Sequence, residues 1–288
     1  MAKPLIVIKD LRKVYRIGTE RVVALNRMSL EIYEGEICCL LGTSGSGKST
    51  LLNMMAGLEK PTSGNIVIDK KTVTSLTEKE LAVFRQGKIG FVFQSYNLLP
   101  SMTALENVAM PLLFLGDSKK NRNTKAKSIL KAVGLEKHMY HRPTQMSGGQ
   151  QQRVGIARAF VNMPKIVFAD EPTGNLDSKT TVEVMAIIIN LAKTHNQTLI
   201  IVTHDPSISK YADRIVHILD GDIASVELNE NPIVPDPPEL KDHVAGVEKT
   251  KKSVKSTKPL KATKLEKAVK AKELKELKKA TKLAKVKK

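Results

Sequence analysis

The sequence predicts an α/β fold in which a parallel sheet carries a phosphate-binding loop. Strand-length apolar runs alternate with helical segments along most of the chain, and this alternation is typical of parallel sheets. The segment 42–49, Gly-Thr-Ser-Gly-Ser-Gly-Lys-Ser, fits the pattern G-x-x-x-x-G-K-[ST]. An apolar run, Ile37–Leu41, precedes the segment and a helical run, 51–55, follows it. Strand, loop and helix in that order are the context that such a loop needs.

Composition indicates one large domain followed by a basic tail. The chain has 288 residues, 41% of them hydrophobic, which is enough for a core. The net charge of +18 is concentrated in residues 249–288, which hold 17 lysines and 3 glutamates, so the rest of the chain is nearly neutral. Cys38 and Cys39 are adjacent and cannot form a disulfide framework, so we expect core residues in a reducing compartment. We recognise no leader and no apolar run near the roughly 18 residues of a membrane span, so another subunit would supply any membrane path.

The elements are predicted in chain order. Residues 5–32 are rich in β-branched residues with a break near Gly18, and we expect antiparallel strands there. Thr77 and Glu80 have the spacing of a capping box, which starts a helix that ends near residue 86. Further strands are expected at 65–69, 89–93, 165–169, 198–203 and 215–219, and further helices at 103–115, 123–133, 150–161 and 178–193.

A second glycine-rich motif decides the family. Residues 146–153, Met-Ser-Gly-Gly-Gln-Gln-Gln-Arg, lead into the helix expected at 150–161. The motif resembles the signature loop of ABC ATPases, which usually begins with leucine where this chain has Met146. The volumes of Met and Leu are similar, so we expect little effect. Other motifs agree in order and spacing: a Walker B-like strand at 166–171, a Q-loop-like Gln94, a D-loop-like segment at 174–177, an H-loop-like His204, and Tyr15 at the adenine-stacking position.

This resemblance covers residues 1 to about 228. It implies a P-loop ABC ATPase cassette with a RecA-like core, an antiparallel β subdomain and a helical subdomain at about 101–163. It also implies that the chain binds and hydrolyses ATP with Mg²⁺.

The chemistry of phosphoryl transfer suits the first motif. Backbone N–H groups surround phosphate oxygens, Lys48 reaches the outer phosphates and the hydroxyl of Ser49 ligates Mg²⁺. Thr50 either steadies the inner phosphate or only begins the following helix. The expected nucleotide contacts in this loop are Gly42, Ser44, Gly45, Gly47, Lys48, Ser49 and Thr50.

The resemblance implies roles for the residues that follow the later strands. Asp170 would hold Mg²⁺, and Glu171 would be the general base that polarises the attacking water. Gln94 would contact the metal and the water, and His204 the terminal phosphate. The implied catalytic residues are therefore Glu171, His204 and Gln94, and the implied metal ligands are Ser49, Gln94 and Asp170.

Further residues imply a head-to-tail dimer. In the resembled family, Ser147, Gly148 and Gly149 close on the nucleotide of the opposite subunit. Asp177 would lie at that interface, or it would cap the helix that begins at Ser178. Tyr15 would stack on adenine, or it would serve as a core aromatic residue.

The branch of the family is indicated by three longer segments. Residues 90–100, 105–108 and 169–177 are similar to the lipoprotein-release, macrolide-export and peptide-antibiotic-export group. Amino-acid importers share most of these residues but usually carry Ser-Ala-Leu-Asp where this chain has Gly-Asn-Leu-Asp. Residues 91–102 are expected to dock a permease's coupling helix, with ordinary subdomain core as the alternative.

These features predict a cytoplasmic ATP-hydrolysing subunit, peripheral on the inner face of the membrane, that powers a separate permease. The expected task is export or extraction of a peptide, a lipopeptide or lipoprotein, or an antibiotic. The alternatives are a soluble ABC ATPase that acts on ribosomes or nucleic acid, which the lysine tail favours, and a cell-division regulator of the same branch. The sequence does not name the substrate, because specificity lies in the membrane subunit.

The C-terminal residues predict no compact domain. Residues 229–248 contain four prolines and predict an extended linker. Residues 249–288 predict a disordered or partly helical low-complexity tail. Such a tail would contact an anionic membrane or nucleic acid through non-specific electrostatics, or it would be solvated with no partner.

Overall fold

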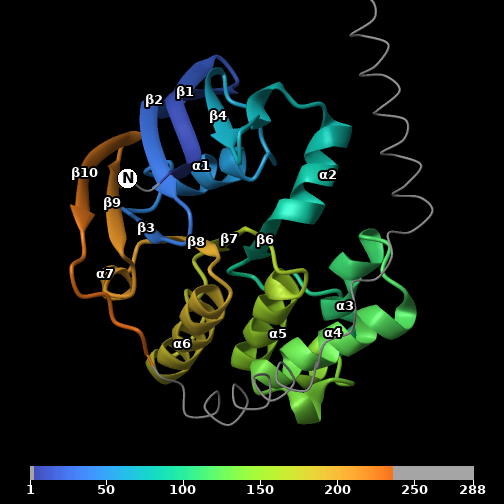
Figure 1. Cartoon of the computed structure of the whole chain (residues 1–288). Coiled ribbons are helices and arrows are strands. Elements are labelled where there is room, and N and C mark those ends of the chain that lie inside the picture. The colour runs from blue at the N-terminus through green and yellow to red at the C-terminus, as the bar shows by residue number, and fades with distance from the viewer. Residues whose placement is uncertain (1–2, 236–288) are drawn as a thin grey trace, which may run out of the picture. The chain divides into compact units, whose positions relative to one another are not determined.

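The computed structural model describes residues 3–235 (Figure 1). These residues lie in the first of two units of the chain, residues 1–243 and 244–288. The described part contains two sheets with the strand orders β2-β1-β4-β5 and β10-β9-β3-β8-β7-β6. The strands of the first sheet are β1 Pro4–Ile17, β2 Glu20–Tyr33, β4 Ser63–Ile68 and β5 Lys71–Thr72. Those of the second are β3 Ile37–Leu41, β6 Ile89–Val92, β7 Ile166–Asp170, β8 Thr198–Thr203, β9 Arg214–Leu219 and β10 Asp222–Leu228.

The predicted α/β fold with a parallel sheet is confirmed. In the larger sheet, β3 pairs in parallel with β8 and β9, and β7 pairs in parallel with β8 and β6. Strand β10 is the antiparallel edge of that sheet. The strands of the smaller sheet pair in antiparallel fashion, as expected for residues 5–32. Because parallel strands end at one edge, the loops after β3, β6, β7 and β8 meet there.

Both faces of the larger sheet are buried, and the side chains of β3 alternate between the two faces. Cys38 and Leu40 pack with the antiparallel sheet and with α1, Lys48–Met55. Ile37, Cys39 and Leu41 pack on the other face, with α5 Gly148–Phe160 and α6 Ser178–Thr194. Successive side chains point to opposite faces, so this one strand contributes to two cores. Figure 1 shows α1 between the two sheets, and α5 and α6 across the larger sheet from it.

The two cysteines are core residues, as predicted. Both are buried free thiols. Burial raises the pKa of Cys39 to about 12 and raises the pKa of Cys38 as well. Neither thiol is therefore a nucleophile at neutral pH.

The remaining long helices begin directly after side-chain caps, of which the sequence predicted the one at Thr77. Side-chain caps precede α2 Glu78–Lys88, α3 Ala104–Phe114 and α5, each with a complete capping box. Helix α4, Lys119–Ala132, begins four residues before the expected start at 123, because Ser118 accepts a hydrogen bond from the backbone N–H of Asn121. A single short turn of helix, α7 Pro206–Ser209, follows β8, and 3₁₀ turns lie at Val73–Ser75, Glu136–His138 and Pro143–Gln145.

The chain remains in contact with this unit beyond β10. Asn229 donates a side-chain hydrogen bond to the carbonyl oxygen of Ala212 at 3.0 Å, and the N–H of Ile233 donates to Lys210 at 2.9 Å. Asn190 of α6 donates to the carbonyl oxygen of Pro235 at 2.6 Å. The predicted boundaries at 228 and 248 stay predictions, and the tail at 249–288 lies outside the described residues. Among residues 3–235, no helix has the length and apolar character needed to cross a membrane.

Candidate active site

A loop between β3 and α1 forms one wall of a pocket at the carboxyl edge of the larger sheet. Gly47 ends this loop with a left-handed φ of 98°, and a Cβ there would collide with the carbonyl oxygen of Ala24. Glycine is therefore needed for the loop to pass directly against β2. The pocket has a volume of about 390 Å³ and is lined by Ala24, Ser44, Gly45, Gly47, Lys48, Ser49, Thr50, Gln94, Glu171 and His204.

Lys48 is held in the loop with its ammonium group largely removed from water. Its side chain is buried, and Nζ donates to the carbonyl oxygen of Thr43 at 2.6 Å and to Ser46 Oγ at 3.4 Å. Burial lowers the pKa of Lys48 despite the attraction of Glu171 and Asp170. A desolvated cation beside neutral acceptors gains from an anionic partner, so the position suits a phosphate.

Ser49 and Asp170 bring two oxygen donors together. The Ser49 hydroxyl donates to Asp170 Oδ1 at 3.3 Å, from the first turn of α1 to the end of β7. Burial raises the pKa of Asp170, and a cation beside the carboxylate would reverse that shift. Hydroxyl and carboxylate oxygens are ligands that Mg²⁺ prefers, so these two side chains fit that ion.

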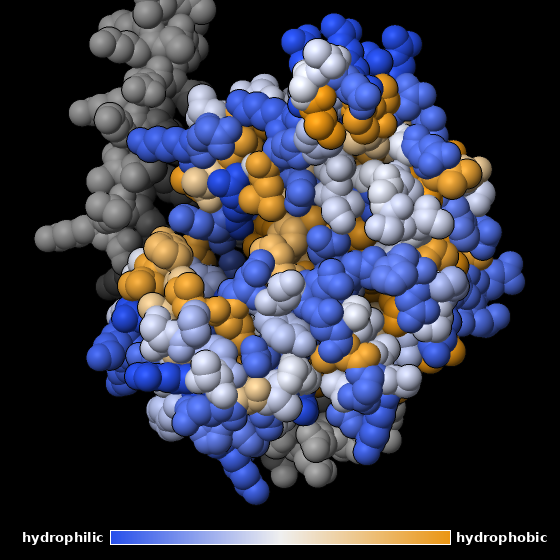
Figure 2. Space-filling view, turned by 180° about the vertical axis from the view of Figure 1, so that it is seen from behind, coloured by the Kyte–Doolittle hydropathy of each residue, from blue (hydrophilic) through white to orange (hydrophobic). Residues whose placement is uncertain are grey.

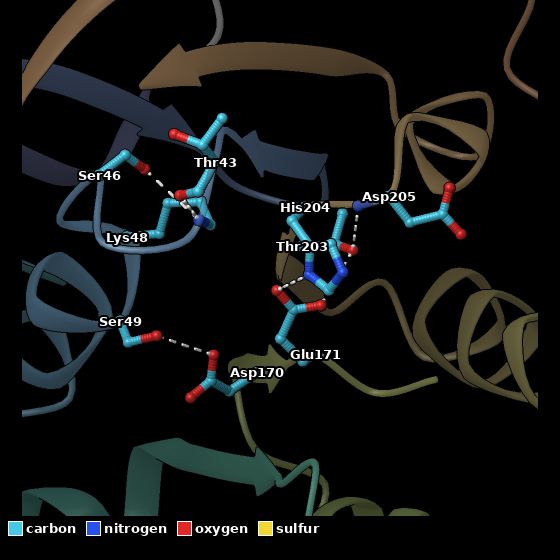
Figure 3. A network of polar contacts seen from close by, with 9 residues as sticks. All are labelled: Thr43, Ser46, Lys48, Ser49, Asp170, Glu171, Thr203, His204 and Asp205. Carbon is cyan, nitrogen blue, oxygen red and sulfur yellow. Dashed lines mark hydrogen bonds and ion pairs between the residues drawn. The ribbon is translucent and has the colours of Figure 1, made fainter. Parts of the chain in front are cut away.

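Glu171 follows Asp170 in a strained backbone conformation. Its φ is 45°, in the left-handed region, and its N–H donates to the carbonyl oxygen of Val202 at 2.9 Å. Thr203 Oγ1 donates to one carboxylate oxygen at 3.2 Å, and His204 Nδ1 lies 2.8 Å from the other (Figure 3). Nine other non-glycine residues of the described chain also have a positive φ, so at Glu171 the conformation matters through the direction that it gives the side chain. The turn thereby places the carboxylate in the pocket rather than beside Asp170 on the strand axis.

Gln94 enters the pocket from the adjacent strand end, just after β6. Its side chain packs against Gly174, where a Cβ would lie 2.7 Å from Gln94 Nε2. Asn175 Nδ2 donates to the carbonyl oxygen of Gln94 at 3.1 Å. The segment after Glu171 therefore fixes the position of Gln94, although the two are far apart in the sequence.

The pocket does not include the residues that the sequence predicts for the opposite subunit's nucleotide. Ser147 caps α5, accepting from the Gln150 N–H at 3.3 Å, and Gly149 packs against Thr180, which leaves no room for a Cβ. Asp177 caps α6 by accepting from the N–H of Thr180 at 3.0 Å, so the capping alternative for this residue is observed. Its place at an interface stays a prediction.

Three further predicted site residues lie outside the pocket lining: Asp170, which reaches it through Ser49, and Gly42 and Tyr15. Gly42 packs against the carbonyl of Ile218, where a Cβ would collide. The Tyr15 hydroxyl donates to Glu59 Oε2 at 2.8 Å, and burial together with that bond raises the pKa of Tyr15. Its ring is half-buried, so the stacking role stays a prediction.

Thr203 is a site residue that no sequence motif marks. Its side chain is 1% exposed, and its hydroxyl accepts from the Asp205 N–H at 3.0 Å while donating to Glu171. A polar residue that ends a fully buried strand was the available signal, since a buried hydroxyl requires partners. Nothing in the local sequence marks Ala24, which lines the pocket from β2. It becomes a pocket residue only because the glycine-rich loop folds against it.

Comparisons with known proteins agree with this geometry. A family model described as ABC transporter matches residues 25–174. The chain is 46% identical over 225 residues to an uncharacterized ABC transporter ATP-binding protein of Thermotoga maritima, covering 78% of this chain and 96% of that protein. It is 49% identical over 219 residues to the macrolide export ATP-binding/permease protein MacB of Syntrophobacter fumaroxidans, covering 75% of this chain. The chain spans only 31% of that longer protein.

Solved structures agree as well. The dimeric structure of the ABC transporter cassette MJ0796, a protein of Methanocaldococcus jannaschii, matches with a TM-score of 0.73 and 44% identity. The match covers 77% of this chain and 98% of the MJ0796 chain. A post-hydrolysis dimer of the same cassette, bound to ADP and Pi, also matches with a TM-score of 0.73.

We expect Thr203→Val to slow ATP turnover while leaving nucleotide affinity nearly unchanged. Valine keeps the shape and removes the hydrogen bond that orients Glu171, which contributes about 1 kcal/mol and corresponds to roughly fivefold in kcat. Steady-state ATPase assays measure kcat and KM separately. Thr203→Ser, which keeps the hydroxyl, is the control and should restore most of the rate. A rise in KM at unchanged kcat would contradict the orienting role.

Proposed function

We propose that this chain, which belongs to the ABC transporter family and is an ATPase, powers a separate membrane permease. The family that the motifs resemble is thus confirmed. One observation carries the ATPase part of the proposal: a buried lysine, the Ser49 hydroxyl and a strained glutamate line one pocket, and Asp170 bonds to Ser49 from the end of β7. Those groups match the needs of phosphoryl transfer to water, which are charge neutralisation, a metal and an oriented water.

The metal in this proposal is Mg²⁺. Ser49 and Asp170 would hold it, with Gln94 as a further oxygen donor from the adjacent strand end. When bound, Mg²⁺ neutralises charge on the phosphate oxygens. Lys48 contributes the remaining positive charge from its loop and orients the outer phosphates.

Glu171 would accept a proton from the attacking water. Its carboxylate is fixed from one side by Thr203 and from the other by His204. The His204 side chain is 60% exposed, so the imidazole can turn from Glu171 toward the terminal phosphate without loss of core packing. The carboxylate oxygen that His204 contacts would then face the water.

A second copy of the chain would complete each site. The Ser147 hydroxyl and the N-terminus of α5 lie outside the chain's own pocket, yet the start of a helix is a favourable position for phosphate oxygens. A head-to-tail pair would bring each signature loop to the other copy's nucleotide. The dimeric MJ0796 cassette supports this arrangement as an example from a relative.

The permease and the substrate class are also part of the proposal. Leu98 packs partly against the helical core whereas Leu99 is 42% exposed, so the segment 91–102 contributes to the core and also offers an apolar side chain to a partner. The similarity to the MacB relative supports export or extraction of an antibiotic, a peptide, or a lipopeptide or lipoprotein. We place the subunit on the cytoplasmic face of the membrane, where ATP is available.

An affinity-tagged chain isolated from detergent-solubilised membranes of its own source should co-purify with an integral membrane protein. Leu99→Glu places a charge in the proposed contact and should lower the recovery of that protein. Val83→Glu, at an exposed position on α2, is the matched control. Recovery of RNA or ribosomes in place of a membrane protein would favour the soluble alternative.

Glu171→Gln should retain ATP binding and lose turnover by about 100-fold or more, because the amide keeps the shape but accepts no proton. A nucleotide-trapped dimer should accumulate, which size-exclusion chromatography with MgATP would detect. Lys48→Ala should weaken nucleotide binding itself. Near-normal turnover in Glu171→Gln would exclude the base assignment.

Ser147→Arg should leave nucleotide binding to the monomer intact and block ATP-driven dimerisation, because the bulky cation would enter the partner's site. Analytical ultracentrifugation of the Glu171→Gln background, with and without Ser147→Arg, provides the comparison. Thr144→Arg, at an exposed position outside the signature motif, is the control. Normal MgATP-dependent dimerisation of the Ser147 variant would show that this loop does not act across an interface.

A further inference from the structure

Three consecutive large apolar residues are exposed where α3 ends. Leu113 is 50% exposed, Phe114 62% and Leu115 44%. Their neighbour Leu112 is buried, so the helix has its core contact on another face. The face of the molecule in Figure 2 is mainly hydrophilic, with hydrophobic residues gathered in a few separate areas. Three large apolar residues that are exposed together indicate a surface that contacts a partner or a membrane.

Helix α4, which follows directly, is strongly basic. It carries six cations and no carboxylate: Lys119, Lys120, Arg122, Lys125, Lys127 and Lys131. Three of these cations lie near its N-terminus, where the helix dipole disfavours positive charge. These three cations therefore destabilise the start of the helix slightly. An anionic partner that contacts them would offset this cost.

Nearby carboxylates neutralise only part of this charge. Residues 113–137 hold seven lysines and arginines against two carboxylates. Asp117 pairs with Lys125 at 2.8 Å and Glu136 pairs with Lys131 at 3.2 Å. In the described part of the chain, Lys119 and Lys120 are exposed and have no ion pair, and Lys119 has only a weaker electrostatic interaction with Glu106 of α3. The surface keeps a clear positive excess.

The turn between the helices joins the apolar and basic parts. Arg122 donates to the carbonyl oxygen of Asp117 at 3.3 Å, and Lys125 binds the carboxylate of the same residue. Ala126, Ile129 and Leu130 of α4 are buried, so the helix packs by one side and its lysines lie on the other. The two bonds to Asp117 thereby hold the first turns of α4, with their cations, close in the chain to Leu113, Phe114 and Leu115. We call these three residues and the six cations the α3–α4 face.

We propose that the α3–α4 face rests on an anionic phospholipid surface. Exposed Phe and Leu gain free energy on entering the headgroup boundary, while lysines beside them are attracted to anionic headgroups. Nucleic acid would satisfy the lysines but would leave Leu113 and Leu115 in water. This contact goes beyond the proposed function, because it is made with lipid directly rather than through a permease.

The natural absence of tryptophan allows a direct test in the full-length chain. Phe114→Trp places one fluorescent reporter on the face, at a position whose exposure tolerates the change. With vesicles of phosphatidylcholine and phosphatidylglycerol, we expect a blue shift of emission and quenching by brominated acyl chains. Phosphatidylcholine vesicles alone should produce neither effect. Val83→Trp, on α2 and 64% exposed, is the matched reporter and should remain unshifted.

Charge variants separate this face from the lysine tail. Lys119→Gln with Lys120→Gln and Lys127→Gln, in the Phe114→Trp background, should reduce the apparent affinity for the anionic vesicles by about tenfold or more. The same charge loss in the tail, Lys261→Gln with Lys264→Gln and Lys267→Gln, should leave the quenching of the reporter by saturating vesicles intact. Basal ATPase activity should be unchanged in both sets, which confirms folding.

Three outcomes would overturn the proposal. The first is vesicle binding without any change in the emission of the Phe114→Trp chain, which would assign binding to the tail. The second is a shift that requires reconstituted permease and is absent with lipid alone, which would assign this face to a protein partner. A shift equally strong for Val83→Trp would likewise show that the contact is not specific to the face.

Discussion

The position of the glycine-rich loop, and of the strand ends beside it, follows from the complete burial of strand β3. Alternate residues of this strand belong to two different cores, one shared with α1 and the antiparallel sheet and the other with α5 and α6. A strand covered on both faces cannot shift its register by one residue without exchanging the two sets of side chains. Its carboxyl end is therefore fixed, and with it the start of the glycine-rich loop. The neighbouring ends of β7 and β8 are fixed by pairing in the same sheet, which brings Asp170 and Thr203 to the same edge.

Burial then acts on the charges at that edge. It lowers the pKa of Lys48 and raises the pKa of Asp170, so each charged form is less favourable than in water. An anion at the lysine and a cation at the carboxylate would relieve both effects, and a metal–nucleotide complex supplies the two together. The left-handed backbone of Glu171 adds local strain at the same place. Buried charges and local strain at one place are features of sites that bind a charged ligand.

Helix α5 connects this edge to the helical region. Its Gln152 donates to the carbonyl oxygen of Pro172 at 2.5 Å, just beyond Glu171. Its Arg158 donates to the carbonyl oxygen of Tyr96 at 2.7 Å, in the turn that follows Gln94. Burial lowers the pKa of this guanidinium, whose usual value is high enough for it to stay charged. The helix that begins at the signature loop therefore contacts the segments that follow both Gln94 and Glu171.

The sequence by itself determined the family, the order of the elements and the identity of most pocket residues. Lys48, Ser49, Asp170, Glu171 and His204 were found because local spacing defines a loop, a strand end or a helix start. Ala24 has no local signal, and the only signal for Thr203 is a polar residue at the end of an apolar strand, because the partners of both come from distant parts of the chain. Local signals also left both readings of Asp177 open, and the structure shows the cap, since a carboxylate before a helix bonds the nearest N–H groups in a single chain. Only the tertiary structure decided that Leu113, Phe114 and Leu115 are exposed near the lysines of α4. The sequence shows that these residues are apolar, but whether the core covers them depends on how the helices pack.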